Sequence, residues 1–308
     1  MVRSAGAVAG FAYRALFVIP DRLQLSITVG LRQAFVAGAA VSGRHNRRVR
    51  LVHIARHPVK SLQGESVSGA AITADGVDGD RCWGIRDEGS GKILTGRREP
   101  RLLFASARLA PDRAPVVTLP DGASYHGPSA ELDRALSAWL AQPVRLVAAD
   151  AVSAARAEYF ADATDDTSQA VEWTMPAGRF VDAMPLLVLT TASLRAAQTR
   201  YPAGDWDLRR FRANLVVDVA GDGWLEDTWC DGRSLQLGGV CLQARQPCIR
   251  CTMITRPQPG LVEDRDLFRT LARGHAGLFG VWSAVLHPGT VHVGDTLRID
   301  ATSSSPMI

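Results

Sequence analysis

The residues best suited to chemistry are two cysteines, Cys248 and Cys251, in the segment 246–252, which reads Gln-Pro-Cys-Ile-Arg-Cys-Thr and follows a predicted strand. A Cys-x-x-Cys pair can be half of a zinc site, a redox dithiol, or one metal-binding cysteine beside a bystander. Zinc would need two more ligands, and although Cys230 and Cys241 are available, they do not form a second Cys-x-x-Cys pair. A thioredoxin-like dithiol normally opens a helix in a βαβ unit, which the surrounding sequence does not predict. The residues alone leave these alternatives open.

A second group with chemical potential is Lys60 and Ser61, at the end of the first predicted strand. An ammonium and a hydroxyl at such a strand-to-turn junction can hold a phosphate or another anion, because both donate hydrogen bonds to it. Taken alone, a Lys-Ser pair on a surface is more often simply solvated. Three further basic segments are equally weak signals singly, and they gain meaning only together with the cysteine pair: residues 80–83, 97–101 and 210–214.

The elements that must position these residues are mostly short strands. From Leu51 onward, apolar runs bounded by Gly, Pro and Asp predict barrels or sandwiches. Helical periodicity is confined to residues 129–141, 191–200, 208–212 and 267–273. No Gly-x-Gly-x-x-Gly turn follows a strand to open a helix, and the P-loop pattern is absent, so a Rossmann dinucleotide site is disfavoured. We therefore predict a mainly β protein with few, peripheral helices.

Composition excludes several classes of protein. The chain has 308 residues, of which 46% are hydrophobic and 21% charged, so it can build one large core or two ordinary ones and is not mainly disordered, collagen-like or coiled-coil. Eight Arg and one acid give residues 1–50 a net charge of +7, which leaves −3 of the total of +4 for the remainder. Such a body is not expected to bind nucleic acid. The odd number of cysteines, five, favours a reducing compartment, and we expect a cytoplasmic location.

The first 49 residues are predicted to be a basic, flexible leader. The apolar runs within residues 5–20 and 34–41 are shorter than the ~20 residues of a spanning helix. A signal peptide is disfavoured because Arg14 interrupts the first run and no convincing cleavage site follows. The alternatives are a start upstream of the native one and a weak membrane or targeting role. Further along, a polar stretch between residues 148 and 178 is predicted to connect two strand-rich halves; its Asp and Thr residues are Asp162, Thr164, Asp165, Asp166 and Thr167.

Taken in order, the motifs resemble the MOSC (molybdenum cofactor sulfurase C-terminal) family, in particular its two-part branch with an N-terminal β-barrel, which includes the mitochondrial amidoxime-reducing component. The resemblance covers about residues 51–299 and rests on these segments: 58–61, 79–83, 95–102, 185–189, 192–194, 211–214, 224–229, 248–251, 279–282 and 293–295. It implies a MOSC N-terminal β-barrel domain over residues 50–170 and a MOSC barrel domain over residues 171–302. The leader over residues 1–49 and a tail over residues 303–308 flank them.

The resemblance also implies the site residues. Members of the family bind the molybdenum cofactor (Mo-molybdopterin), and the Cys251 thiolate, a soft ligand, falls where one cysteine binds molybdenum and serves catalysis. Cys248 is not expected to touch the metal and is instead expected to be a small buried hydrophobe. Because a phosphate dianion removed from water needs charge-assisted hydrogen bonds, the family surrounds the pterin and its phosphate with polar groups. The corresponding residues are Lys60, Ser61, Arg81, Arg212 and Asn214, with Asp182 and Trp282 as further pocket residues.

The implied reaction is the two-electron reduction of an N-hydroxylated small molecule, such as an amidoxime or a hydroxylamine, without pyridoxal phosphate. Electrons would come from a separate cytochrome b5-like protein, ferredoxin or flavoprotein, because no Cys-x4-Cys-x2-Cys ferredoxin run is present. His57 and the carboxylates near Arg81 are candidate proton relays, and no membrane partner is expected. One departure is the segment 256–260, Arg-Pro-Gln-Pro-Gly, where relatives commonly have Asp-Pro-x-Thr-Gly, so the substrate geometry there is open.

Two alternatives to a reductase remain at this point. The first is a non-catalytic carrier that holds the molybdenum cofactor, or a persulfide on Cys251, for other enzymes, and the same residues would serve it. The second is a structural zinc protein, whose four ligands would be Cys230, Cys241, Cys248 and Cys251.

Overall fold

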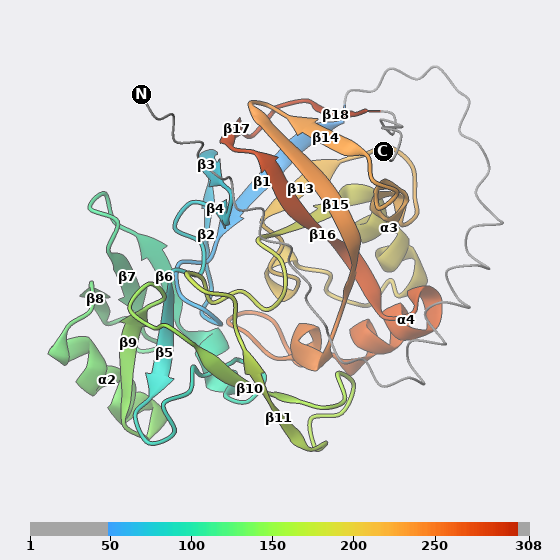
Figure 1. The fold of residues 1–308 in the computed structure, drawn as a ribbon. Helices are drawn as coiled ribbons and strands as arrows, with labels where there is room; N and C mark the ends of the chain where they lie inside the picture. The colour runs from blue at the N-terminus through green and yellow to red at the C-terminus, as the bar shows by residue number, and fades with distance from the viewer. Residues whose placement is uncertain (1–48, 301–308) are drawn as a thin grey trace, which may run out of the picture. The chain divides into compact units, whose positions relative to one another are not determined.

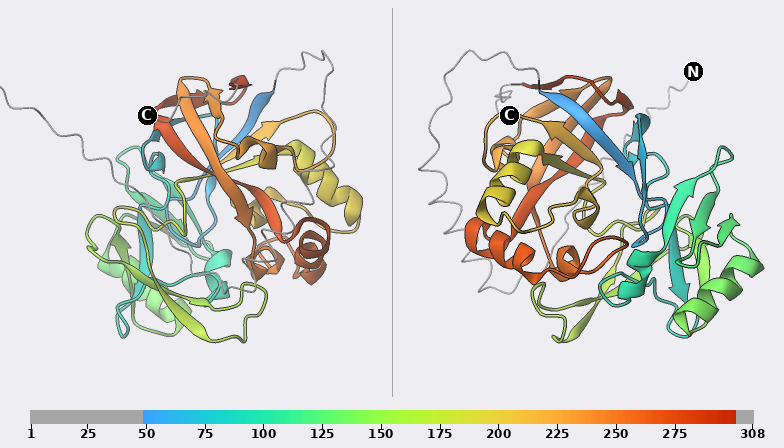
Figure 2. Two further views of the ribbon diagram at one scale, coloured as in Figure 1. Left: turned by 45° about the vertical axis from the view of Figure 1, so that its right-hand side comes forward. Right: turned by 180° about the vertical axis from the view of Figure 1, so that it is seen from behind.

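The computed structural model describes residues 49–300, and its β-rich architecture is shown in Figure 1. Among the described residues there are eighteen strands and only three α-helices, so the prediction of a mainly β protein with few helices is confirmed. The α-helices are α2 (Ala130–Leu140), α3 (Thr191–Arg200) and α4 (Arg265–His275), and the 3-10 helices are η1 (Pro100–Phe104), η2 (Leu208–Arg210), η3 (Leu225–Trp229) and η4 (Thr252–Thr255). Figures 1 and 2 show α3 and α4 together beside the large sheet, and α2 beside the smaller sheets.

The large sheet has eight strands in the order β18-β14-β15-β16-β12-β13-β1-β2. Its strands are β1 (Arg50–Arg56), β2 (Glu65–Val67), β12 (Leu186–Thr190), β13 (Leu215–Asp218), β14 (Ser234–Leu237), β15 (Val240–Ile249), β16 (Leu278–His287) and β18 (Leu297–Ile299). Neighbouring strands are antiparallel except β12 and β13, which are parallel. Every residue of β12 is buried, which explains its uninterrupted apolar sequence: a strand covered on both faces has no need for polar alternation.

The smaller sheets lie in the first half of the chain, apart from one strand. Their strands are β3 (Gly69–Thr73), β4 (Gly76–Val77), β5 (Trp83–Asp87), β6 (Ser106–Leu109), β7 (Pro115–Thr118), β8 (Ser124–His126), β9 (Val144–Ala148), β10 (Arg156–Phe160), β11 (Ala170–Thr174) and β17 (Gly289–His292). Helix α2 covers β8 and β9. Its N-cap Ser129 accepts a hydrogen bond from the Leu132 amide, and Leu132, Leu136 and Leu140 then recur every four residues toward a second hydrophobic core.

The first strands of the chain complete the sheet of the second half. Strand β1 lies between β2 and β13, and β3 pairs with both β4 and β17. The buried side chains of Leu51, Ile54 and Ile72 therefore share one core with Val188 and Val217. The domain boundaries predicted from the sequence stay predictions. Strands β1 and β3, from the predicted N-terminal domain, pair with β13 and β17, from the predicted second domain.

The polar stretch between residues 148 and 178 is more than a connection, contrary to our prediction. It contains the antiparallel hairpin β10–β11, in which Arg156 lies opposite Thr174 and Phe160 lies opposite Ala170. Tyr159, Phe160 and Trp173 provide the aromatic character that suits a strand, but the Asp- and Thr-rich loop between the strands dominates the composition of the stretch. The two strands of the hairpin are thus joined by a polar loop, residues 161–169.

The N-terminus of α3 is held by a buried carboxylate, Glu226. The side chain of the N-cap residue Thr190 accepts a hydrogen bond from the Ser193 amide. The hydroxyls of Thr190 and Ser193 in turn donate to Glu226 Oε2, at 2.6 and 2.7 Å. Glu226 has no exposed surface, and burial raises its pKa to about 7 against the effect of these two hydrogen bonds. The motif that carries Glu226 therefore joins η3 to α3.

None of the helices within residues 49–300 combines the length and the apolar character needed to cross a bilayer. Apart from Val49, the predicted leader lies outside the described residues, as does the predicted tail.

Candidate functional site

The site is built first from a turn that follows β1, residues 57–61. The Lys60 amide donates to the Trp83 carbonyl at 2.8 Å, and the Arg81 amide donates to the His57 carbonyl at 2.7 Å, so residues 57–61 and 80–83 lie against each other. The His57 amide also donates to the Asp80 carboxylate at 2.6 Å. Two of the basic segments noted in the sequence are thereby brought into one place.

Three of the predicted site residues adopt the left-handed backbone conformation, with φ of 68° at Ser61, 51° at Arg81 and 53° at Arg212. Only six non-glycine residues among those described have a positive φ, so half of them belong to this site. The conformation costs an L-residue about 1–2 kcal/mol, and such outliers concentrate where surrounding structure fixes a functional geometry. The backbone of this site is therefore fixed by its surroundings at the expense of local strain.

Lys60 is buried, and its ammonium donates to the Phe180 carbonyl at 3.0 Å and to the Asp182 carboxylate. Desolvation lowers the pKa of Lys60 in spite of this carboxylate. The Asp182 carboxylate also accepts from the Tyr159 hydroxyl at 2.7 Å. Desolvation opposes its ionisation, but the Lys60 ammonium and the Tyr159 hydroxyl lower the pKa of Asp182 to about 2. Because the Asp182 side chain is 62% exposed, this ion pair lies at the border between the interior and solvent.

Arg81 and Arg212 add two guanidinium groups to Lys60. Arg81 forms an ion pair with Asp80, whereas Arg212 donates from Nη1 to the Leu62 carbonyl at 2.6 Å. The other terminal nitrogen of Arg212, Nη2, is buried and has no hydrogen-bond partner. Desolvation and the charge of Arg81 lower the pKa of Arg212 to about 9. We call Lys60, Arg81 and Arg212 the cationic group; with Asp80 and Asp182 it carries one net positive charge.

His57 lies beside the cationic group and is uncharged at neutral pH. Desolvation and the Arg212 guanidinium lower the pKa of His57 to about 3, against the effect of Asp80. Its Nδ1 atom lies 3.5 Å from the Asp80 carboxylate and forms no hydrogen bond. A second buried polar atom without a partner thus accompanies Nη2 of Arg212.

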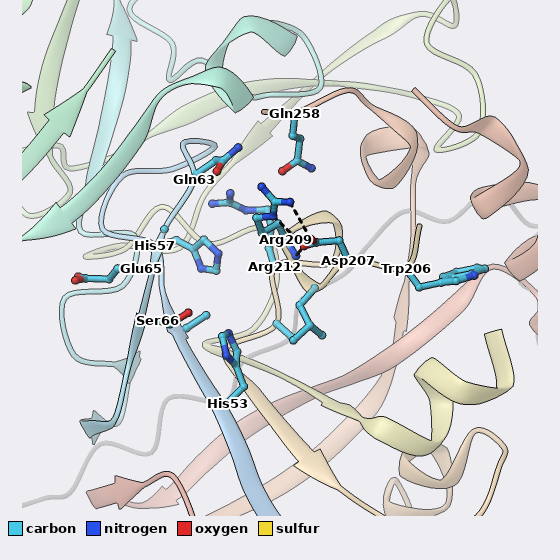
Figure 3. Close-up of a pocket in the computed structure, with 14 residues that line it drawn as sticks. His53, His57, Gln63, Glu65, Ser66, Trp206, Asp207, Arg209, Arg212 and Gln258 are labelled. Carbon is cyan, nitrogen blue, oxygen red and sulfur yellow. Dashed lines mark hydrogen bonds and ion pairs between the residues drawn. The ribbon is translucent and has the colours of Figure 1, made fainter. Parts of the chain in front are cut away.

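A cavity of about 460 Å³ opens beside these atoms. Figure 3 shows His57 and Arg212 between the strands β1 and β2 on one side and the loop around Asp207 and Arg209 on the other, with Gln63 and Gln258 above them. The polar side chains in its wall are those of His53, His57, Gln63, Glu65, Ser66, Asp207, Arg209, Arg212 and Gln258. The donors in this wall outnumber the carboxylates, which suits an anionic or acceptor-rich ligand.

Cys251 lies two residues after the end of β15, where it is the N-cap residue of η4, and it is partly exposed. One set of contacts brings the segment that follows Cys251 toward the turn with Lys60. A Cβ placed on Gly96 would lie 3.0 Å from Met253 of η4 and 3.4 Å from Ser61, and the Gly96 amide donates to the Ser61 hydroxyl at 2.8 Å. The segment after Cys251 and the turn with Lys60 therefore meet at Gly96.

Cys248 occupies a different environment from Cys251. It is buried in an apolar cluster that includes Phe211 and Phe279. Burial raises the pKa of its thiol, which also receives a 3.2 Å hydrogen bond from Arg250 Nη1. Arg250 Nη2 donates to the Phe211 carbonyl at 2.8 Å, so this arginine links the cysteine pair to the loop of Arg212. The arrangement fits the bystander role that the resemblance implies for Cys248.

Asn214 is buried and bonds two strands of the large sheet, and Trp282 is partly buried on β16. The Asn214 amide accepts from the Leu187 amide at 3.2 Å and donates to the Ala55 carbonyl at 3.4 Å, so it joins β1 to β12. Trp282 lies on β16 opposite Leu187 and packs against the apolar cluster of Cys248. Contacts of these two side chains with a cofactor stay predictions, and the structure gives both an internal packing role.

The sequence missed Tyr159 and the two glutamines. Tyr159 has no neighbouring motif and lies in the stretch that we predicted to be a connection, so only the fold brings it to Asp182. Gln63 follows the Lys60 turn and Gln258 lies in the segment that departs from the family pattern, and both line the cavity. Arg250 could have been found, because it lies between the two cysteines.

The four cysteines of the zinc alternative do not converge. Within residues 49–300, no three or more His, Cys, Asp or Glu side chains are grouped so that they could hold a metal ion, and all five cysteines are free.

Comparison with known proteins agrees with this architecture. Residues 48–166 match the MOSC N-terminal beta barrel domain, and residues 176–298 match the MOSC domain. The mitochondrial amidoxime-reducing component 1 proteins of Homo sapiens and Mus musculus are 27% and 28% identical to the chain over 285 and 303 residues, alignments that cover 79% and 83% of this chain and 80% and 85% of those proteins. A molybdenum cofactor sulfurase of Drosophila erecta is 27% identical over 266 residues, which are 79% of this chain but 32% of that protein. The two matched domains confirm the resemblance found in the sequence: the chain belongs to the MOSC family, in its two-part form with an N-terminal beta barrel domain.

Proposed function

We propose that this protein is a molybdenum-cofactor-dependent oxidoreductase that reduces N-hydroxylated compounds, such as amidoximes and hydroxylamines, with electrons from a separate redox protein. The observation that carries the proposal is that the segment after a partly exposed thiol, Cys251, and the turn that holds Lys60 and Ser61 meet at Gly96. The names of the human and mouse relatives, both amidoxime-reducing components, support the choice of substrate class.

The residues present fit the molybdenum cofactor. A phosphate removed from water needs charge-assisted hydrogen bonds, and Arg212 offers a buried, unpartnered N–H beside a cavity. Lys60, Ser61, Arg81 and Arg212 would hold the anionic part of the cofactor. Cys251 would bind the molybdenum, because its thiol is a soft ligand and is not packed into the apolar cluster that holds Cys248.

When bound, the cofactor supplies a centre that delivers two electrons to the substrate. The conversion of an N–OH group to N–H with release of water consumes two electrons and two protons. Tyr159 is suited to hold one of these protons, because desolvation and the neighbouring Asp182 raise the pKa of its phenol well above the usual value. Its hydroxyl is therefore protonated throughout the physiological range and donates to Asp182; a rotation away from this carboxylate would let it donate instead to a substrate oxygen that develops negative charge.

The electrons would come from a cytochrome b5-like protein, a ferredoxin or a flavoprotein.

The decisive test is the metal content of protein produced in a host that synthesises the cofactor. We expect close to one molybdenum per wild-type chain and background levels for Cys251→Ala. Cys248→Ala is the matched control, because it removes the other thiol of the pair, and it should keep the wild-type level. Equal, near-background molybdenum in all three proteins would exclude the proposal.

A non-catalytic carrier of the cofactor or of sulfur is the second candidate, favoured by the similarity to part of a molybdenum cofactor sulfurase. Turnover of benzamidoxime by the molybdenum-loaded protein with an artificial electron donor separates the two functions. Turnover that Cys251→Ala abolishes supports the reductase, whereas full molybdenum occupancy without turnover supports the carrier.

A further inference from the structure

The loop between β10 and β11, residues 161–169, extends from the first half of the chain to the segment that follows Cys251. Figure 1 shows the yellow-green hairpin β10–β11 passing close to the orange segment between β15 and α4, and the left view of Figure 2 shows the same approach. The Thr252 amide donates to the Ala163 carbonyl at 3.1 Å. The loop therefore contacts the residue directly after Cys251.

Asp166 is the centre of this contact. Its carboxylate accepts from the Thr252 hydroxyl at 2.7 Å and pairs with Arg256 Nη2 at 2.5 Å. The carboxylate also accepts from Arg97 Nε at 3.4 Å. One side chain of the loop thus contacts Thr252, the first residue of η4, and Arg256, the residue after its end, and joins both to Arg97.

Arg97 is a firm anchor for this carboxylate, because it is itself buried. Its guanidinium donates to the carbonyls of Phe160 and Asp162 and lies 5.1 Å from the centre of the Phe160 ring. Arg256 adds a 3.4 Å hydrogen bond to the Arg97 carbonyl. Hydrogen bonds between charged groups that are partly withdrawn from water are stronger than exposed ones, so these contacts fix the loop in place.

The neighbouring acids of the loop have a different role. The Asp165 carboxylate accepts from the amide and the hydroxyl of Thr167, at 2.8 and 2.7 Å, and Asp162 does the same for Thr164, at 2.7 and 2.8 Å. These are local turns within the loop. Asp166 alone among the three acids makes side-chain contacts with the segment 252–256.

We propose that residues 161–169 form a strap over the Cys251 segment and that Asp166 is the positioning residue that fastens it. The strap would hold the peptide between Cys251 and Thr252 in place and restrict the approach of bulky molecules to the Cys251 thiol. Where the proposed reductase function holds, the strap favours compact N-hydroxylated substrates over bulky ones, and only this consequence rests on that function.

Thiol labelling of the full chain, produced in a host that lacks the cofactor, tests the strap without molybdenum. Purified wild type, Asp166→Ala and the matched control Asp165→Ala are treated with iodoacetamide, a small reagent, and with N-(1-pyrenyl)maleimide, a bulky one. Labelling is followed at Cys251 and, as an internal reference, at the partly exposed Cys230 by peptide mass spectrometry.

We expect Asp166→Ala to accelerate labelling of Cys251 by the bulky reagent about tenfold relative to Cys230, which is the usual effect of losing one charge-assisted contact. Asp166→Ala should accelerate labelling of Cys251 by the small reagent much less. Asp165→Ala should be labelled at the wild-type rate by both reagents. General loosening of the fold would instead raise the labelling rates of both cysteines with both reagents. Wild-type labelling of Cys251 in Asp166→Ala, or equal acceleration in Asp165→Ala, would overturn the proposal.

Two further variants keep the test decisive if Asp166→Ala does not fold. Thr252→Val removes the hydroxyl from the other side of the same contact with little change in shape, and it should accelerate bulky labelling in the same direction. Asp166→Glu restores the carboxylate and should return the rate toward that of wild type. In molybdenum-loaded protein, Asp166→Ala and Thr252→Val should lower KM for a bulky amidoxime relative to benzamidoxime, and Asp166→Glu should not. A changed labelling rate without turnover of either substrate would contradict the reductase function and leave the strap supported.

Discussion

Two groups of charged or titratable residues are largely withdrawn from water in this protein, and they differ in what surrounds their unpaired atoms. His57 and Arg212 line a cavity, and each has one buried nitrogen without a partner, Nδ1 and Nη2. Glu226 also has one buried oxygen without a partner, Oε1, but two hydroxyls donate to its Oε2 and it does not line this cavity. The first group retains hydrogen-bonding capacity where a ligand can reach it, whereas Glu226 holds α3.

The comparison shows that burial alone does not identify a binding site. Both groups have strongly shifted pKa values because desolvation disfavours their charged forms. What distinguishes them is the cavity, which Arg212 and His57 line, and the left-handed backbone, which occurs at Ser61, Arg81 and Arg212 and not at Glu226. Each of the following experiments acts on one side of this contrast.

Arg212→Ala should have the largest effect. Truncation of a buried, hydrogen-bonded charge typically weakens binding of its ionic partner by about a thousandfold, so molybdenum occupancy should fall to background. The matched control is Arg209→Ala, since Arg209 lines the same cavity but is exposed and paired with Asp207. Retention of molybdenum by Arg212→Ala, measured by elemental analysis, would remove the distinction between the two buried groups.

His57 should make the protein less stable in acid. Because its pKa falls from 6.5 to about 3 on folding, the unfolded state binds more protons between these values, and stability rises with pH across this window. The free energy of unfolding should decrease by about 3 kcal/mol from pH 7 to pH 4 through this residue. Urea titrations of wild type and His57→Gln at both pH values measure the effect; an unchanged pH dependence in the variant would show that His57 is not desolvated.

Glu226 should act in the opposite direction. Its pKa rises to about 7 on folding, so its favourable contribution is fully present below pH 4.5 and is lost as the pH rises through 7. Glu226→Gln keeps the shape and an acceptor for the two hydroxyls, and it should stabilise the protein by about 2 kcal/mol at pH 8 relative to pH 5. Thermal unfolding at the two pH values reports the difference. A variant that is equally destabilised at both would indicate that the ionised form of Glu226 is the one the fold requires.

Asp182→Asn should have the smallest effect on stability. The lowered pKa of Asp182, about 2, contributes stability above pH 4 that is lost as the pH falls toward 2. Because this side chain is 62% exposed, solvent screens the ion pair with Lys60 and we expect a loss of about 1 kcal/mol at pH 7. Tyr159→Phe is the control, as it removes the neutral hydrogen bond and keeps the charge. A loss several times larger in urea titrations would place Asp182 with the fully buried groups.

Part of the predicted site follows from an ordered series of short motifs. The structure brings Lys60, Ser61, Arg81 and Arg212 together, and their binding of a cofactor stays a prediction. Local patterns also predicted helices α2, α3 and α4, because an apolar face repeats along each of them. These features are encoded over a few neighbouring residues.

Features that depend on distant residues were not predicted. Tyr159 reaches Asp182 because β10 pairs with β11, and the polar loop between those strands concealed them. The Asn214 side chain forms hydrogen bonds with the backbone of Ala55 and Leu187 because β1 pairs with β13. Residue types at these positions are compatible with several partners, and only the complete fold selects one.

The place of β1 has a consequence for how the molecule is made. This strand leaves the ribosome before the rest of the large sheet, yet its neighbour β13 is synthesised more than 150 residues later, and Leu51 shares a core with Leu297. Contacts so far apart along a chain close slowly, because the loop entropy must be overcome first. Strand β1 therefore stays without its neighbour β13 until residue 218 has emerged, and chaperones are expected to bind the growing chain during that interval.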